Sequence, residues 1–147
     1  MSEENKPNQE FGINQIYIKD LSFEAILPLY QLKADWRPNV SANLDNTFNK
    51  VDEDFYEISI KMKVSVSVEE KTVFVVEIEQ AGLFKLGGFD EKQMGQLLNS
   101  FCPNILFPYL RESVASCVVK GGYPALHLSP VDFDARYVEM LDKKKAS

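Results

Sequence analysis

Two cysteines and one histidine are the side chains whose types could support covalent catalysis. A thiol next to an imidazole can act as nucleophile and base, so Cys102 or Cys117 with His127 would suit a hydrolase. Cys117, however, falls on the apolar stripe of a predicted helix, where buried and unreactive thiols are common. His127 lies between two leucines in a predicted loop, and no catalytic motif surrounds either cysteine. The pattern therefore favours structural roles for all three residues.

The sequence offers few residues that could bind a metal ion or a phosphate group. A single histidine excludes a site made of several histidines from one chain, and the two cysteines do not form a CxxC pair. Gly87 and Gly88 lack the spacing of a phosphate-binding loop. The sequence therefore predicts no metal centre.

Charge and hydropathy exclude several kinds of binding partner and a membrane-spanning segment. The chain has 147 residues, with 16 basic and 22 acidic side chains and a formal net charge of −6. This balance argues against binding to nucleic acid or to an anionic membrane, since both depend on clustered Lys and Arg. The first nine residues, MSEENKPNQ, are polar, and no apolar run reaches the roughly 18 residues of a membrane span. We expect a cytoplasmic protein without direct membrane insertion.

Acidic residues recur at alternate positions of predicted strands. In residues 11–26 most aromatic side chains fall on odd positions, whereas Asp20 and Glu24 fall on even ones. Because successive strand side chains point to opposite faces, we expect the odd positions to face the core. The opposite face should then carry acidic residues beside apolar ones, namely Asp20, Glu24, Glu57, Glu77 and Glu79 with Ile16, Ile18, Val73 and Val75. Such a surface is either an ordinary solvated sheet face or a docking patch.

An apolar connection follows this first strand. Residues 27–38, LPLYQLKADWRP, contain two prolines, so they predict a crossover loop and not a strand. The loop carries Leu29, Tyr30, Leu32 and Trp36, although exposed connections are usually polar. These side chains either cover the edge of the core or form the wall of a binding groove.

The strand patterns are clearest in the middle of the chain. Residues 56–68 alternate apolar and polar side chains, and residues 73–85 do the same after a turn at residues 69–71. Two such runs joined by a few polar residues predict an antiparallel hairpin. A short strand over residues 40–45 and the first strand bring the predicted sheet to four strands.

Helical patterns come after the strands. Asp90 and Gln93 form a capping-box pair before an apolar stripe. Pro103 and Pro108 should interrupt or kink the helix, and a second stripe then continues to Gly121.

A last helix is predicted with Ser129 as its N-cap, Pro130 at its first position and Asp132 closing a capping box. Because strands precede helices, we expect an α+β fold, a four-stranded antiparallel sheet with helices packed on one face. No repeat or linker divides the chain. The expected organisation is a disordered N-terminus over residues 1–10, a single domain over residues 11–141 and a flexible tail over residues 142–147.

Four segments of the sequence carry a family resemblance. They are IYIKDLSFEA at 16–25, DWRP at 35–38, CPNILFPYLRE at 102–112 and LSPVDFDA at 128–135. In this order they resemble the signatures of SecB, a family of bacterial preprotein-export chaperones. The resemblance extends from about Phe11 to Leu141.

The resemblance implies a homotetramer, built as a dimer of dimers, with no enzymatic activity and no cofactor. Such a protein holds unfolded preproteins in the cytoplasm and delivers them to SecA, the ATPase of the Sec translocase. The positions that match the family's SecA-binding residues are Asp20, Glu24, Val75 and Glu77. Those that match its client-binding groove are Trp36, Leu44, Phe133 and Tyr137. The crossover at residues 27–30 is more apolar than the family's usual pattern, and the tail is short and basic.

Three other functions remain open at this point. The chain could be a SecB-like chaperone dedicated to a toxin–antitoxin pair. It could be a small enzyme that uses Cys102 and His127, or a structural oligomer without clients.

Overall fold

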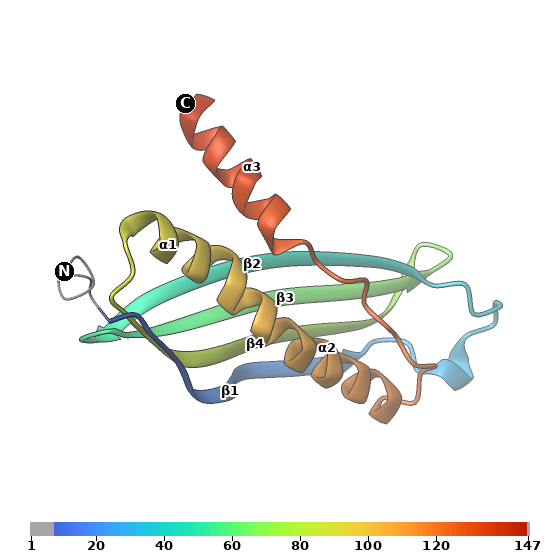
Figure 1. The fold of residues 1–147 in the computed structure, drawn as a ribbon. Coiled ribbons are helices and arrows are strands. Elements are labelled where there is room, and N and C mark those ends of the chain that lie inside the picture. The colour runs from blue at the N-terminus through green and yellow to red at the C-terminus, as the bar shows by residue number, and fades with distance from the viewer. Residues whose placement is uncertain (1–7, 147) are drawn as a thin grey trace, which may run out of the picture.

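The computed structural model describes residues 8–146, which form one antiparallel sheet with helices on one face (Figure 1). The sheet has four strands in the order β1-β4-β3-β2. Their bounds are Glu10–Ala25 for β1, Asn39–Asp52 for β2, Phe55–Val68 for β3 and Lys71–Gly87 for β4. The predicted α+β class, with four antiparallel strands and helices, is confirmed.

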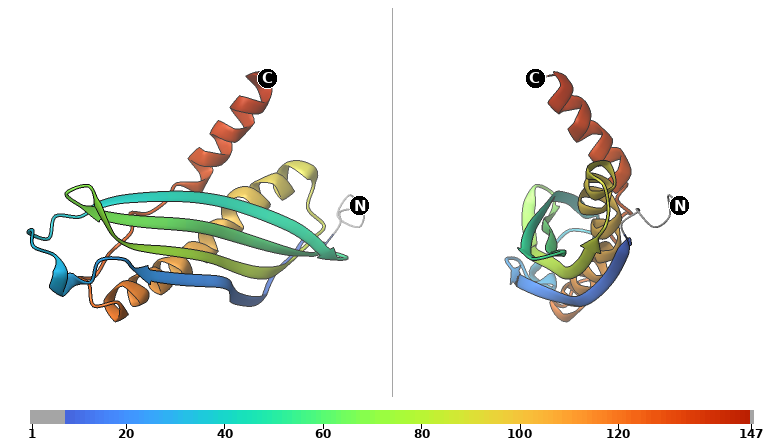
Figure 2. Two further views of the ribbon diagram at one scale, coloured as in Figure 1. Left: turned by 180° about the vertical axis from the view of Figure 1, so that it is seen from behind. Right: turned by 60° about the vertical axis from the view of Figure 1, so that its left-hand side comes forward.

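The helices form one long run and one separate element. The run consists of α1 (Glu91–Gln96), the π-helical turn η3 (Leu97–Phe101) and α2 (Cys102–Lys120), and it crosses one face of the sheet diagonally (Figures 1 and 2). The separate helix α3 (Phe133–Ala146) projects away from the sheet, and a short 3₁₀ turn, η2 (Leu29–Gln31), lies in the crossover. Helix α3 therefore extends past the predicted domain boundary at Leu141.

The two prolines do not end the long helical run. Pro103 lies in the first turn of α2, where a missing backbone N–H costs little, and Pro108 lies inside the helix. The preceding π-helical turn, at Leu97–Phe101, adjusts the backbone before the first proline. The helix then continues to Lys120 and ends before Gly121, as predicted.

One of the two predicted helix caps is confirmed and the other is wrong. Asp90 accepts a hydrogen bond from the Gln93 backbone N–H at 2.7 Å, and the Gln93 side chain accepts one from the Asp90 N–H at 3.1 Å. The last helix is capped by Asp132, whose carboxylate accepts from the Ala135 N–H at 3.0 Å, and not by Ser129. Residues 124–132 instead run without helix, because alternate apolar side chains of that segment pack against the core.

The predicted hairpin is confirmed, with a two-residue turn between β3 and β4. Glu69 and Glu70 both have positive φ, 50° and 68°. Positive φ at both central residues is the feature of a type I′ turn, whose twist matches that of the flanking strands. Glutamate pays a steric cost in this conformation that Asn and Gly avoid.

Two β-bulges in β1 change which of its side chains face the helices. The register with β4 shifts between Ile13 and Gln15 and again between Ile18 and Asp20. Each extra residue reverses the alternation, so Ile16 and Ile18 lie opposite Gly82 and Gln80 on the covered face. The prediction that these isoleucines lie beside Asp20 on the open face is therefore wrong.

The core lies between the sheet and the long helical run. It contains the apolar positions of β3 and β4 together with the buried side of α2. Val73 is fully buried in this core, at a register shift between β3 and β4, so its predicted place on the acidic face is also wrong.

An aromatic cluster fastens the crossover loop to the core. Trp36 stacks on Tyr123 with ring centroids 6.0 Å apart, and Tyr123 also packs against Phe74 at 4.7 Å. The Tyr123 hydroxyl lies within hydrogen-bonding distance of the carbonyl oxygens of Leu27 (2.9 Å) and Val73 (3.0 Å). The apolar character of the loop thus serves, at least in part, to cover the edge of the core.

Candidate functional site

The face of the sheet opposite the helices is uncovered in the structure, as the view from behind shows (Figure 2). We call it the open face. Its side chains come from alternate positions of all four strands, and the strand register places them in rows. The two central rows are Asp20–Glu79–Lys61–Asp45 and Ser22–Glu77–Lys63–Asn43.

The four predicted docking residues gather on one half of the open face. Asp20 lies opposite Glu79, and the next row places Glu77 opposite Ser22. In the row after that, Glu24 lies opposite Val75. Strands β1 and β4 thus present three carboxylates with one half-buried valine at the end of the group. We call Asp20, Glu24, Val75 and Glu77 the acidic quartet.

The carboxylates of the open face differ in how they are held. Asp20 and Glu24 are exposed and form no ion pair with another residue in the described part of the chain. Glu77 lies 3.6 Å from the ammonium group of Lys63. Glu79 accepts a hydrogen bond from the Ser59 hydroxyl at 3.0 Å, and Ser59 bonds Thr47 at 2.9 Å. Glu79 is therefore tied into the sheet, whereas Asp20 and Glu24 are exposed to solvent.

A second polar group on this face ties β1 to β3. Glu57 accepts hydrogen bonds from the ammonium group of Lys19, at 2.8 Å, and from the hydroxyl of Tyr17. These bonds hold the pKa of Glu57 below its ordinary value. Burial, with the nearby carboxylate, raises the pKa of Tyr17 to about 12. This group could not be predicted from a single alternation, because Tyr17 lies between the two bulges, where the faces of β1 are reversed.

An apolar groove lies at the other edge of the sheet. It has a volume of about 460 Å³ and runs between β2 and the connection that precedes α3. Its apolar lining comes from Val40, Ala42, Leu44, Met62, Leu126, Leu128, Pro130 and Val131, and its polar lining from His127, Ser129 and Arg136. The alternation of Leu126 and Leu128 in the sequence was the signal that could have pointed to this wall.

The predicted client-binding residues lie in different surroundings. Leu44 lines the apolar groove, and Tyr137 lines an adjacent polar hollow that shares Arg136 with it. The Arg136 guanidinium donates to the Leu44 carbonyl at 2.9 Å and separates the two. Trp36 belongs to the aromatic cluster under the crossover. Phe133 is only 2% exposed and packs edge-on against Phe107 in the core, and it borders a separate hollow of about 370 Å³ beside η3.

The cysteine and histidine candidates show no catalytic arrangement. Cys102 is fully buried in the core, and burial raises its pKa to about 12. A catalytic thiol needs the opposite shift, since the thiolate is the nucleophile. His127 is exposed and lines the apolar groove.

Neither a cluster of metal-ligand side chains nor a membrane-spanning helix is found among the described residues. Within residues 8–146 no group of three or more His, Cys, Asp or Glu side chains could hold a metal ion. Among the same residues, no helix combines the length and the hydropathy that crossing a membrane requires.

Curated relatives cover nearly the whole chain. A protein-export protein SecB of Methylococcus capsulatus is 45% identical over 142 residues, which span 96% of this chain and 92% of the relative. A protein-export protein SecB of Marinobacter nauticus is 41% identical over 142 residues, 97% of this chain and 86% of the relative.

A solved structure shares the fold. A SecB-like chaperone of Mycobacterium tuberculosis, in complex with an antitoxin peptide, superposes with a TM-score of 0.68 over 82% of this chain and 90% of its own. The two sequences are 16% identical, so the likeness concerns the fold alone. The family described as "Preprotein translocase subunit SecB" matches this chain over residues 3–144. With this match and relatives at 41% and 45% identity, the chain belongs to the SecB family.

Proposed function

We propose that this chain is an ATP-independent chaperone that holds preproteins unfolded in the cytoplasm and delivers them to the SecA ATPase. Membership of the SecB family supports this function. The observation that carries the proposal is that Asp20 and Glu24 of β1 and Val75 and Glu77 of β4, which are about 50 residues apart in sequence, come together on the open face.

The acidic quartet suits a basic docking partner. Exposed carboxylates attract a cationic surface and speed its encounter, and they fix the orientation of the complex. Val75 lies opposite Glu24 in the end row of the patch and offers an apolar contact beside the carboxylates. SecA would bind here through basic residues with an apolar one beside them.

The apolar groove beside β2 suits an extended, apolar segment of an unfolded client. Its walls are aliphatic over most of their length, so contact with them depends little on client sequence. Strand β2 is an edge strand, so its free backbone groups can pair with an extended chain next to the groove. We propose that Leu44 contacts the client inside this groove. We propose that Tyr137 and Trp36, which lie outside the groove lining, contact it as well.

We further propose that the protein assembles as a homotetramer and has no enzymatic activity. The burial and raised pKa of Cys102 speak against a thiol enzyme. Strand β1 is the opposite edge of the sheet, and it exposes Phe11, Ile13, Ile18 and Leu21 on the covered face, where Phe101 of η3 packs against Phe11. Beside them, the buried amide oxygen of Gln80 accepts no hydrogen bond from the described residues. A second copy on this strip would bury its apolar surface and supply a donor.

Sedimentation tests the assembly. The wild-type protein should sediment with the mass of a tetramer, and Ile18→Asp should sediment as a smaller species. Val51→Asp introduces the same charge at an exposed valine of β2, the other edge strand, and should leave the mass unchanged. A monomeric wild-type protein would contradict the proposed assembly.

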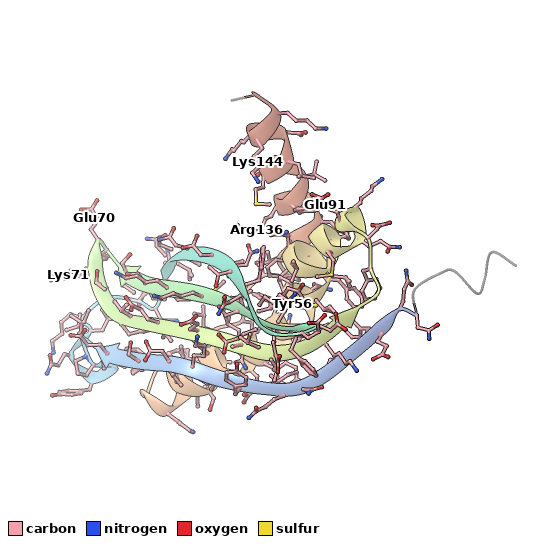
Figure 3. All side chains as sticks on the ribbon, turned by 90° about the vertical axis from the view of Figure 1, so that its left-hand side faces the viewer. Tyr56, Glu70, Lys71, Glu91, Arg136 and Lys144 are labelled. Atoms are coloured by element: carbon pink, nitrogen blue, oxygen red, sulfur yellow. The ribbon has the colours of Figure 1, made fainter. Side chains whose placement is uncertain are left out.

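Charge reversal tests the docking surface. Glu77→Lys should abolish SecA binding measured by calorimetry, while the variant still binds an unfolded preprotein. Glu70→Lys makes the same change of charge at the tip of the β3–β4 hairpin, where the side chain points away from the molecule (Figure 3), and should bind SecA normally. Normal SecA binding by Glu77→Lys would remove the acidic quartet from the docking site.

The toxin–antitoxin alternative has weaker support. It rests on the solved SecB-like chaperone, and at 16% identity that likeness extends to the fold only. The relatives named as protein-export proteins are far closer in sequence and cover nearly the full chain. Export is therefore the function that we propose.

A further inference from the structure

Two lysines of β3 share the open face with the acidic quartet. Lys61 lies opposite Glu79, and Lys63 lies opposite Glu77. On the other side, β2 places Asp45 opposite Lys61 but only the neutral Asn43 opposite Lys63. Glu77 is thus the one member of the quartet that faces a cation of its own chain directly across the sheet.

The contact between Lys63 and Glu77 is weak and open to solvent. The ammonium nitrogen lies 3.6 Å from the carboxylate oxygen, and the side chains are 57% and 43% exposed. Beside them is a shallow hollow of about 210 Å³ between β2 and β3, lined in part by both residues and by Lys61. Exposed pairs of this kind shift an equilibrium by about fivefold at most. A cation of a binding partner can therefore replace Lys63 as the neighbour of Glu77. Breaking the Lys63–Glu77 pair costs part of the free energy that the new contact gains.

The neighbouring lysine is placed differently. Lys61 lies between two carboxylates, Glu79 and Asp45, and Glu79 is already held by Ser59. Asp20 and Glu24 have no lysine opposite them, since their partners across β1 and β4 are Glu79 and Val75. Of the open-face lysines in the described chain, Lys63 is the one that forms an ion pair with the quartet.

We propose that Lys63 limits the affinity of the docking surface by competing with the partner's basic residues for Glu77. This inference rests on the proposed function, in which the partner is SecA. A cation of the partner that approaches Glu77 must break the internal pair and also meets repulsion from the ammonium group of Lys63. Both effects restrict the contacts of the partner's basic residues to β1 and β4. They also keep binding reversible, which suits a chaperone that must dissociate from its partner after it delivers a client.

Removal of the lysine charge tests the inference. Lys63→Ala should bind SecA about threefold to fivefold more tightly than wild type at low ionic strength, measured by calorimetry. The gain should shrink in high salt, because exposed charge interactions are screened. Lys71→Ala changes the net charge by the same amount at the hairpin tip (Figure 3), and its affinity should stay within twofold of wild type.

A second background shows whether Lys63 acts through Glu77. In a Glu77→Gln protein, the Lys63→Ala change should produce less gain than in wild type. An equal gain in both backgrounds, or a gain no larger than that of Lys71→Ala, would overturn the inference. A wild-type protein that does not bind SecA would instead contradict the proposed function, and the role of Lys63 with it.

Discussion

Tyr123 connects three parts of the chain through one side chain. Its ring lies against Trp36, Phe74 and Phe23, with centroids 6.0, 4.7 and 6.3 Å away, and its hydroxyl reaches two backbone carbonyls at the start of the crossover and in β4. Burial raises the pKa of this hydroxyl, which keeps it in the donating form. The crossover is thereby fixed at the end of the sheet.

The loss of that hydroxyl should cost stability. Tyr123→Phe keeps the aromatic packing but leaves the Leu27 carbonyl without its donor, so we expect a loss of about 1 kcal/mol in the free energy of unfolding in urea. Tyr30→Phe is the matched control, since the Tyr30 side chain is exposed and its hydroxyl bonds only Gln31. Equal stability of the two variants would contradict the role of Tyr123.

Glu57 should make stability depend on pH. Hydrogen bonds from Lys19 and Tyr17 lower its pKa in the folded state, so its contribution is present above the unfolded pKa of Glu, about 4.3, and is lost as pH falls through the lower folded value. The stability difference between wild type and Glu57→Gln should therefore be largest at neutral pH and shrink in acid. Urea unfolding at pH 7 and pH 3 measures it, with Glu53→Gln as an exposed control. A difference that is the same at both pH values would contradict this account.

The strand β1 shows where alternation in the sequence is informative and where it fails. Apolar residues occupy odd positions at Phe11 and Ile13, even positions at Ile16 and Ile18, and odd positions again from Leu21. A single alternation cannot bury all of them, and the two bulges resolve the conflict by reversing the face twice. The change of parity was visible in the sequence, but we interpreted it as a mixed acidic and apolar face.

The turn between β3 and β4 is a weak point of an otherwise regular hairpin. Glu69 and Glu70 both adopt positive φ, which costs an ordinary side chain about 1 kcal/mol. Replacing the pair with Asn-Gly should raise the free energy of unfolding by about 1 kcal/mol or more, because these residues suit a type I′ turn. The same pair placed at Glu91 and Lys92, in the first turn of α1, should not stabilise the protein. An unchanged midpoint of urea unfolding for the turn variant would show that the turn is not strained.

The start of α3 could not be predicted from its local sequence, because it depends on packing between elements. Its capping residue could not be chosen from sequence, since Ser129 and Asp132 both suit the position. The choice depends on the preceding segment, whose Leu126, Leu128 and Val131 pack against the core and keep it extended. Packing of this kind links distant parts of the chain and leaves no local signal.

At the scale of the whole molecule, the two faces and the two edges of the sheet have different surroundings. The helices bury one face of the sheet, the open face carries the acidic quartet, β2 adjoins the apolar groove and β1 exposes an apolar strip. The α+β class, the hairpin and the positions of the quartet followed from alternation and from the family resemblance. The groove did not, because its second wall is a connection far from β2 in sequence. Of the predicted client-binding residues, Leu44 lines this groove, whereas Phe133 is buried beside another hollow.

The central claim is that this chain captures unfolded preproteins and keeps them from aggregating. Light scattering of a preprotein diluted from denaturant tests it most directly, with and without the purified protein and without ATP. The account predicts that scattering is suppressed at a stoichiometric excess of the protein, and that Leu44→Asp in the groove weakens the suppression while Glu77→Lys leaves it intact. Full aggregation of the preprotein in the presence of the wild-type protein would contradict the account.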